Sequence, residues 1–251
     1  MRILRYICLV LLAISSFIFS FPKGQKNLYQ SEIEKLLKKS GQIILVTSDS
    51  WEETSANLSC YERSETIFKK VSDDIPVLLG KSGLGWGRGL IEFEKSDGPI
   101  KKEGDKRAPA GIFSLPYVFG LLPADSMKWL NYPYQQISKL NECVDDTTSD
   151  SYNKIVNTFE TNKTWKSSEN MDDPDYKYGI VISHNSSPVE KGCGSCIFFH
   201  LTGPKQKPTA GCTSMDEESL LRLLHWLDAE KKPVLIQLPK SEFEKIKQLF
   251  R

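Results

Sequence analysis

The residues best suited to covalent chemistry gather in one segment of this chain, residues 192–217. Cys212 follows a Thr209-Ala-Gly turn sequence, and His200 lies 12 positions before it. A cysteine becomes a strong nucleophile when an imidazole within hydrogen-bonding reach removes its proton. The two residue types therefore predict nucleophilic catalysis, with Cys212 as the nucleophile and His200 as the base.

The pattern after Cys212 suggests how the thiol would be activated. Ser214-x-x-Glu217 has the form of a capping box, so a helix is expected over residues 215–227. Cys212 would then lie directly before a helix N-terminus, where the dipole and unpaired N–H groups lower a thiol pKa. The backbone N–H groups around Gly211 and Cys212 are expected to hold an oxyanion.

Three histidines are available as the base. His225 lies in the expected helix more than three turns beyond Cys212, which is too far for proton transfer. His184 and His200 both lie near the ends of expected strands. His200 directly precedes the loop that leads to Cys212, so a hairpin-like return would bring it beside the thiol. A partly buried strand residue is the plain alternative for His200.

A metal site is the strongest competing hypothesis. Cys193, Cys196, His200 and Cys212 provide four nitrogen and sulfur ligands, which is the set that a structural zinc ion uses. Export of the protein would favour disulfides over such a site. We therefore expect no metal and no other cofactor.

The surrounding elements are mostly short strands. They are expected at residues 43–47, 57–62, 76–79, 91–93, 179–183, 196–201 and 234–238. Besides the helix after Cys212, one further helix is expected at residues 31–39, opened by a capping box at Ser31 and Glu34. Residues 141–178 are polar and aromatic, without a long apolar run, and are expected to form a surface insertion. The chain is predicted to be mainly β with few helices.

The first twenty residues have the layout of a secretory signal. Arg2 and Arg5 precede an apolar stretch at residues 7–19, which is shorter than the ~20 residues that span a bilayer. The protein is therefore expected to be exported to the periplasm or cell envelope, with residues 1–20 as a signal peptide. An uncleaved anchor is the alternative, because Ile18 and Phe21 make a poor cleavage site.

Charge and cysteine content restrict the function further. The chain has 33 Lys+Arg against 32 Asp+Glu, which gives no electrostatic basis for binding nucleic acid. Cys8 would leave with the signal, so an odd number of cysteines remains and at least one stays unpaired. With Cys212 reserved as the nucleophile, three pairings are formally open among Cys60, Cys143, Cys193 and Cys196. A bridge from Cys143 to Cys193 or Cys196 is the favoured one.

The active-site segment resembles a known family. Phe199-His200 and Pro208-Thr-Ala-Gly-Cys212 look like the signature of the L,D-transpeptidase (YkuD-type) catalytic domain, and residues 102–113 resemble an upstream segment of that domain. Parts of the insertion, such as Cys143-Val-Asp-Asp146, resemble one exported bacterial branch. The similarity runs from about residue 43 to residue 238.

The sequence departs from the family pattern at four positions. Ala108 stands where the family usually has Thr, and Ala210 where many members have His. Thr213 and Ser214 stand where many members have an Arg or Asn just past the cysteine. The departures at Ala210, Thr213 and Ser214 put in doubt a side-chain contribution to oxyanion or carboxylate binding from those three positions.

The resemblance implies a β-sandwich that acts on peptidoglycan stem peptides. Residues 21–42 would form a helical lead-in, and residues 43–251 the catalytic domain. The thiolate would form a thioester with one stem, and an amine of a second stem would resolve it into a 3→3 cross-link. Hydrolysis by water, as in an L,D-carboxypeptidase or amidase, and a non-catalytic wall-binding module are the alternatives.

The resemblance also implies acylation by carbapenem-type inhibitors. Candidate substrate-binding residues are Thr209, His184, Lys102 and Arg107, with Lys205 as a further candidate for a substrate carboxylate.

Overall fold

The computed structural model describes residues 23–93 and 98–250. The strands are β1 (Gln42–Ser48), β2 (Ser55–Ser64), β3 (Ile67–Lys70), β4 (Ile75–Leu78), β5 (Leu84–Trp86), β6 (Ala108–Ser114), β7 (Val118–Gly120), β8 (Tyr134–Gln136), β9 (Asn141–Val144), β10 (Ile155–Asn157), β11 (Ser168–Asn170), β12 (Gly179–Val181), β13 (Phe198–Leu201), β14 (Thr213–Met215) and β15 (Val234–Pro239). The helices are α1 (Lys23–Lys39), α2 (Glu217–Trp226) and α3 (Lys240–Glu244), with short 3₁₀ turns η1 (Ala124–Met127), η2 (Pro174–Tyr176), η3 (Ala229–Lys231) and η4 (Lys247–Phe250). The predicted mainly β fold with few helices is confirmed.

The main sheet is mixed and runs in the order β5-β6-β15-β1-β2-β4-β14-β13-β12-β7-β8, with β3 on β2. Strand β1 pairs in parallel with β15, so two segments far apart in the sequence are neighbours inside this sheet. Its residues Ile43, Ile44 and Val46 have no exposed surface. The near-continuous apolar character of β1 and β15 follows from burial on both faces.

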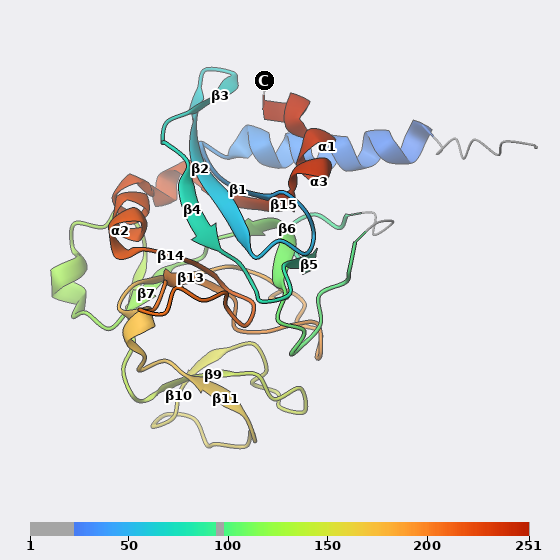
Figure 1. Ribbon diagram of the computed structural model, residues 1–251. Helices are drawn as coiled ribbons and strands as arrows, with labels where there is room; N and C mark the ends of the chain where they lie inside the picture. The colour runs from blue at the N-terminus through green and yellow to red at the C-terminus, as the bar shows by residue number, and fades with distance from the viewer. Residues whose placement is uncertain (1–22, 94–97, 251) are drawn as a thin grey trace, which may run out of the picture.

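Helices cover this sheet at two places (Figure 1). Helix α3 contacts β1 and β15, and α1 packs near it through η4. Helix α2 contacts β13, one of the two strands that carry the candidate reactive residues. Its apolar stripe at Leu220, Leu223 and Leu224 is buried, as a helical period of 3.6 residues requires.

A second, three-stranded sheet in the order β10-β9-β11 is formed entirely by residues 141–170. Figure 1 shows it on the side of the molecule opposite α1 and α3, beneath β13 and β14. The predicted polar insertion at residues 141–178 contains this sheet and the turn η2. The insertion thus lies against the strands that carry Cys212 and His200.

Three expected elements differ from the structure. Helix α1 begins at Lys23, so Ser31 lies inside the helix and does not cap it. Residues 91–93 form no strand, although Ile91 and Phe93 are buried and Phe93 stacks on Trp86 with ring centroids 4.8 Å apart. Burial of Ile91 and Phe93 in the core accounts for the apolar character of that segment. The third difference, at the start of α2, concerns the site.

No helix in the part of the chain that the structure describes is long and apolar enough to cross a membrane. The predicted signal peptide, residues 1–20, lies outside the described residues.

Candidate active site

Cys212 lies directly before β14, and its thiol contacts Phe198 at the start of β13. The parallel register places His200 opposite Ser214, so Phe198, His200 and Cys212 share one face of the strand pair. The Cys212 Sγ accepts a hydrogen bond from the Phe198 N–H at 3.3 Å and donates one to the Cys196 carbonyl oxygen at 3.4 Å. The expected nucleophile and base therefore come from neighbouring strands and face the same side.

The backbone orients the His200 imidazole. Its Nδ1 lies 2.8 Å from the Leu201 carbonyl oxygen. Because a carbonyl only accepts hydrogen bonds, Nδ1 carries the proton and Nε2 keeps the lone pair that a base requires. Burial lowers the pKa of His200, while the Leu201 carbonyl and the charge of Asp175 oppose this shift. The ring is thus neutral at physiological pH and able to accept a proton.

The expected helix N-terminus at Cys212 is wrong. Residues 213–215 pair with β13 as strand β14, and α2 begins only at Glu217. Asp216 caps the helix, with its side chain accepting a hydrogen bond from the Ser219 N–H at 2.9 Å. The predicted capping box at Ser214 is therefore absent. A helix dipole acts only within the first turn, so it does not activate the thiol.

The expected low pKa of Cys212 is also wrong for the free protein. Burial of the thiol raises its pKa, and the nearby Glu169 carboxylate raises it further. The Phe198 N–H and the positive charge of Lys101 act in the opposite direction. The thiol is consequently protonated in the resting protein and must lose its proton when substrate is bound.

The turn before Cys212 is held by Thr209. Its Oγ1 donates a hydrogen bond to the Cys212 carbonyl oxygen at 2.6 Å and accepts one from the Gly211 N–H at 3.0 Å. A Cβ at Gly211 would lie 3.2 Å from the Arg107 carbonyl oxygen and 3.3 Å from Cδ1 of Ile197. A side chain here would therefore need its neighbours to move by a few tenths of an ångström, and the Gly211 N–H is already used within the turn. Of the two predicted oxyanion donors, the Cys212 N–H is the better candidate.

The family model of YkuD, the L,D-transpeptidase catalytic domain, matches residues 54–236. The chain belongs to this family. Its members are enzymes that act on peptidoglycan peptides through a cysteine nucleophile, and the mainly β architecture agrees with the family's β-sandwich. The matched range contains Cys212, His200 and the whole insertion.

One solved structure shows a distant likeness to this L,D-transpeptidase-family chain. It is the crystal structure of the helical cell shape determining protein Pgp2 from Campylobacter jejuni, with 14% sequence identity and a TM-score of 0.40. The likeness covers 90% of this chain and 60% of that chain, so this chain spans less than two thirds of its length. No curated protein matches the chain in sequence.

A buried cation lies beside the L,D-transpeptidase motif. Lys101 is 4% exposed, and its Nζ donates hydrogen bonds to Asp105 at 2.6 Å and to the Lys102 carbonyl oxygen at 2.7 Å. The same Nζ would lie 3.9 Å from a Cβ at Gly211. Sequence reasoning missed Lys101, because only the fold distinguishes it from its exposed neighbour Lys102.

His184 is buried and bonded on both sides of its ring. Nδ1 accepts a hydrogen bond from the Arg88 N–H at 3.2 Å, and Nε2 donates one to the Cys193 carbonyl oxygen at 2.9 Å. Burial lowers the pKa of His184 to about 4. With 2% of its surface exposed, His184 ties two loops together instead of facing a ligand.

The candidate cations are separated by the fold. The Arg107 guanidinium donates a hydrogen bond to the Leu84 carbonyl oxygen at 2.8 Å, which anchors it to β5. Lys102 and Lys205 are exposed. None of these three residues makes a hydrogen bond or ion pair with Cys212 or His200, all five being within the described part of the chain.

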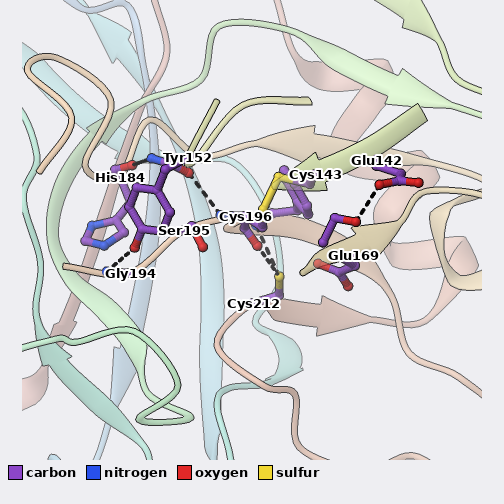
Figure 2. The surroundings of a disulfide bond; sticks show 12 residues. Glu142, Cys143, Tyr152, Glu169, His184, Gly194, Ser195, Cys196 and Cys212 are labelled. Atoms are coloured by element: carbon purple, nitrogen blue, oxygen red, sulfur yellow. Dashed lines mark hydrogen bonds between the residues drawn. A yellow bond between two sulfur atoms is a disulfide. The ribbon is translucent and has the colours of Figure 1, made fainter. Parts of the chain in front are cut away.

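The insertion reaches the reactive strands through a disulfide. Cys143 on β9 is bonded to Cys196, one of the two partners that were favoured for it. Figure 2 shows this bond next to Cys212, with Glu169 on the same side. The disulfide fixes the backbone carbonyl that accepts the Cys212 hydrogen bond.

The disulfide also contradicts the zinc hypothesis. Cys196 is bonded to Cys143 and offers no thiolate to a metal, so the set Cys193, Cys196, His200 and Cys212 is incomplete. Among the residues with described positions, no other group of His, Cys, Asp and Glu side chains is arranged to hold a metal ion.

A cleft of about 460 Å³ opens along β4 and β14. Its lining includes Thr202, Ser214 and Asp216, but neither Cys212 nor His200. The cleft adjoins the reactive pair through Ser214, the residue opposite His200, without containing it.

Proposed function

We propose that this chain is an exported L,D-transpeptidase that forms 3→3 cross-links between peptidoglycan stem peptides through a thioester on Cys212. The family membership and the placement of Cys212 and His200 on one face of β13 and β14 support this proposal. No metal or organic cofactor enters the chemistry.

The first half-reaction is acyl transfer to sulfur. His200 Nε2 takes the proton of Cys212 Sγ, and the sulfur attacks the carbonyl carbon of the amide between a diamino acid at stem position three and D-alanine at position four. The Cys212 N–H stabilises the negative oxygen of the tetrahedral intermediate. The C–N bond then breaks, His200 returns the proton to the departing nitrogen, and D-alanine leaves.

The second half-reaction regenerates the thiol. An amine of another stem attacks the thioester carbonyl, loses a proton to His200, and forms a new amide as the C–S bond breaks. Water in the same role would give a carboxylic acid, which is the reaction of an L,D-carboxypeptidase. Both outcomes require the same nucleophile and base.

The observation that carries the proposal is the hydrogen bond from His200 Nδ1 to the Leu201 carbonyl oxygen. It selects the neutral tautomer with a free lone pair on Nε2, on the strand face that Cys212 shares. A lone pair on Nε2, on the strand face that Cys212 shares, is what a general base requires.

The proposed location is the periplasm or cell envelope, where peptidoglycan lies. Residues 1–20 would direct export, residues 21–42 would form the lead-in that includes α1, and residues 43–251 would form the catalytic domain. The Cys143–Cys196 disulfide supports this assignment, because structural disulfides persist in oxidising compartments.

The test is incubation of the purified protein with muropeptides, with products identified by mass. Release of D-alanine together with a 3→3 dimer is the expected result. Release without a dimer would replace the transpeptidase by the carboxypeptidase. The Cys212→Ser protein, which lacks the nucleophile, is the matched control. If the natural chain left the muropeptides as unchanged as this control does, only a wall-binding role would remain.

A further inference from the structure

The insertion brings a carboxylate to the Cys212 thiol. Glu169 lies on β11, directly opposite Cys143 of β9 in the antiparallel register. Cys143 is bonded to Cys196, whose carbonyl oxygen accepts the hydrogen bond from Cys212 Sγ. Figure 2 shows the Glu169 side chain beside Cys212, on the side of the disulfide. A short chain of contacts thus joins this acid to the nucleophile.

The Glu169 carboxylate is only partly satisfied by the protein. Its Oε1 accepts a hydrogen bond from the Tyr176 hydroxyl, and Oε2 accepts none from the residues that the structure describes. Burial raises the pKa of Glu169, and the charges of Asp145 and Asp173 raise it further. No Lys or Arg of the described residues forms an ion pair with it, so none of them compensates its charge.

This carboxylate opposes the chemistry that the site must perform. Four ionisable groups surround Cys212, namely Glu169 on β11, Tyr176 on η2, His200 on β13 and Lys101 before β6. Lys101 is the one lysine among them, and it forms an ion pair with Asp105 on the Gly211 side of the thiol. A negative charge on the other side makes formation of a thiolate harder. Thiolate formation becomes easier if a cation compensates the Glu169 charge during the reaction.

We propose that Glu169 binds a primary ammonium group of the donor peptide, and that the insertion thereby makes the enzyme selective for donors that carry one. This inference rests on the proposed function, in which the attacked carbonyl belongs to a diamino acid. The second amino group of that residue is a cation attached to the same residue as the reacting carbon. Its ion pair with Glu169 would fill the unused Oε2 position.

Binding of the donor would then also activate the thiol. With the Glu169 charge compensated by the ammonium group, removal of the Cys212 proton by His200 no longer creates two adjacent negative charges. The resting thiol stays protonated and unreactive until a donor with the correct side chain arrives. Substrate recognition and activation of the nucleophile are thereby coupled at one carboxylate.

The test compares two tetrapeptide donors that differ only in whether the side-chain amine of residue three is free or acetylated. We expect kcat/KM of the natural chain for the free amine to exceed that for the acetylated donor roughly tenfold to a hundredfold, the value of a charge-assisted hydrogen bond. Glu169→Gln keeps an acceptor for Tyr176 and should bring this ratio close to one. Asp150→Asn, the same charge change at an exposed site of the insertion, should leave the ratio as in the natural chain. An unchanged ratio in Glu169→Gln would overturn the proposal.

Two further measurements keep the inference separate from folding and from the proposed function. Equal kcat/KM of the natural chain for the two donors overturns the inference even if Glu169→Gln does not fold. If neither donor is turned over, the proposed function fails, and binding of the two peptides to the Cys212→Ala protein still reports whether Glu169 prefers the ammonium group. Iodoacetamide should alkylate Cys212 faster in Glu169→Gln than in the natural chain at neutral pH, and an equal rate would contradict the electrostatic argument.

Discussion

At the scale of single residues, His184 and His200 differ in what their ring nitrogens bind. His184 has both nitrogens bonded within the protein, whereas His200 uses only Nδ1 in the part of the chain with described positions. This difference assigns proton transfer to His200 and loop anchoring to His184. Substitutions at the two positions should therefore change different quantities.

Replacing the base should reduce turnover without unfolding the protein. His200→Ala should lower kcat/KM for a stem tetrapeptide by ~10²–10⁴-fold, the usual contribution of a positioned acid–base group. Its thermal unfolding temperature should stay within a few degrees of that of the natural chain. His225→Ala, at an exposed position on α2, is the matched control and should retain turnover. Full activity of His200→Ala would exclude it as the base.

His184 should make stability depend on pH. The pKa of His184 is about 4 in the folded chain, against an ordinary value of 6.5, so the unfolded chain binds the proton more readily between these values. Its stabilising contribution is therefore complete above pH 6.5 and is lost as the pH falls towards 4. Melting temperatures measured across this range should fall with acidification, and less steeply in His184→Gln. Parallel curves would show that His184 does not titrate in this way.

The reactive pair could be predicted from the sequence, but its electrostatic surroundings could not. Cys212 and His200 are recognisable because their residue types and the turn sequence between them are local. Lys101 and Glu169 become relevant only because β11 pairs with β9 and because Lys101 is buried beside Gly211. Such long-range contacts leave no local pattern.

At the scale of elements, α2 supports β13 but does not activate the nucleophile. Asp216→Ala removes the N-cap and should lower the free energy of unfolding by ~1 kcal/mol. The rate at which iodoacetamide alkylates Cys212 should not change, since β14 separates the thiol from the helix. If iodoacetamide alkylated Cys212 more slowly in Asp216→Ala, the result would show that the dipole of α2 does activate the thiol.

The disulfide ties the insertion sheet to the reactive strands. Cys143 and Cys196 are separated by 53 positions, and closing a loop of that length stabilises the folded state by about 4 kcal/mol. Reduction should therefore lower the urea concentration at the unfolding midpoint. It should also slow turnover of the stem peptide, because the Cys196 carbonyl that accepts the Cys212 hydrogen bond is no longer fixed. In the Cys143→Ala/Cys196→Ala protein the reductant should have no further effect on the midpoint. An equal midpoint for oxidised and reduced natural chain would contradict this role.

Strands with local apolar runs could be predicted from the sequence, whereas the strands with which they pair could not. Strands β1 and β15 were expected within one or two residues of their observed ends, yet nothing local indicates that they pair in parallel. The segment at residues 91–93 has a strand-like composition because Ile91 and Phe93 are buried in the core, although it forms no strand. The start of α2 was misplaced because Ser214 fits a capping box, while pairing with β13 extends the chain past it.

At the scale of the whole molecule, a β-sandwich provides the nucleophile and base, and an insertion covers them with a disulfide and a carboxylate. The family match runs through both parts, from residue 54 to residue 236. Both the transpeptidase reaction and its carboxypeptidase alternative require that Cys212 carries the acyl group of the donor peptide.

The most direct measurement is the mass of the protein quenched in acid during turnover of a stem tetrapeptide, followed by peptide mapping. The predicted result is one added tripeptide acyl group, released D-alanine, and a thioester located on the peptide that contains Cys212. The Cys212→Ser protein should show no thioester, and His200→Ala should accumulate it more slowly at the same position. An acyl group on Cys193 or Cys60, or continued turnover by Cys212→Ser, would contradict the account.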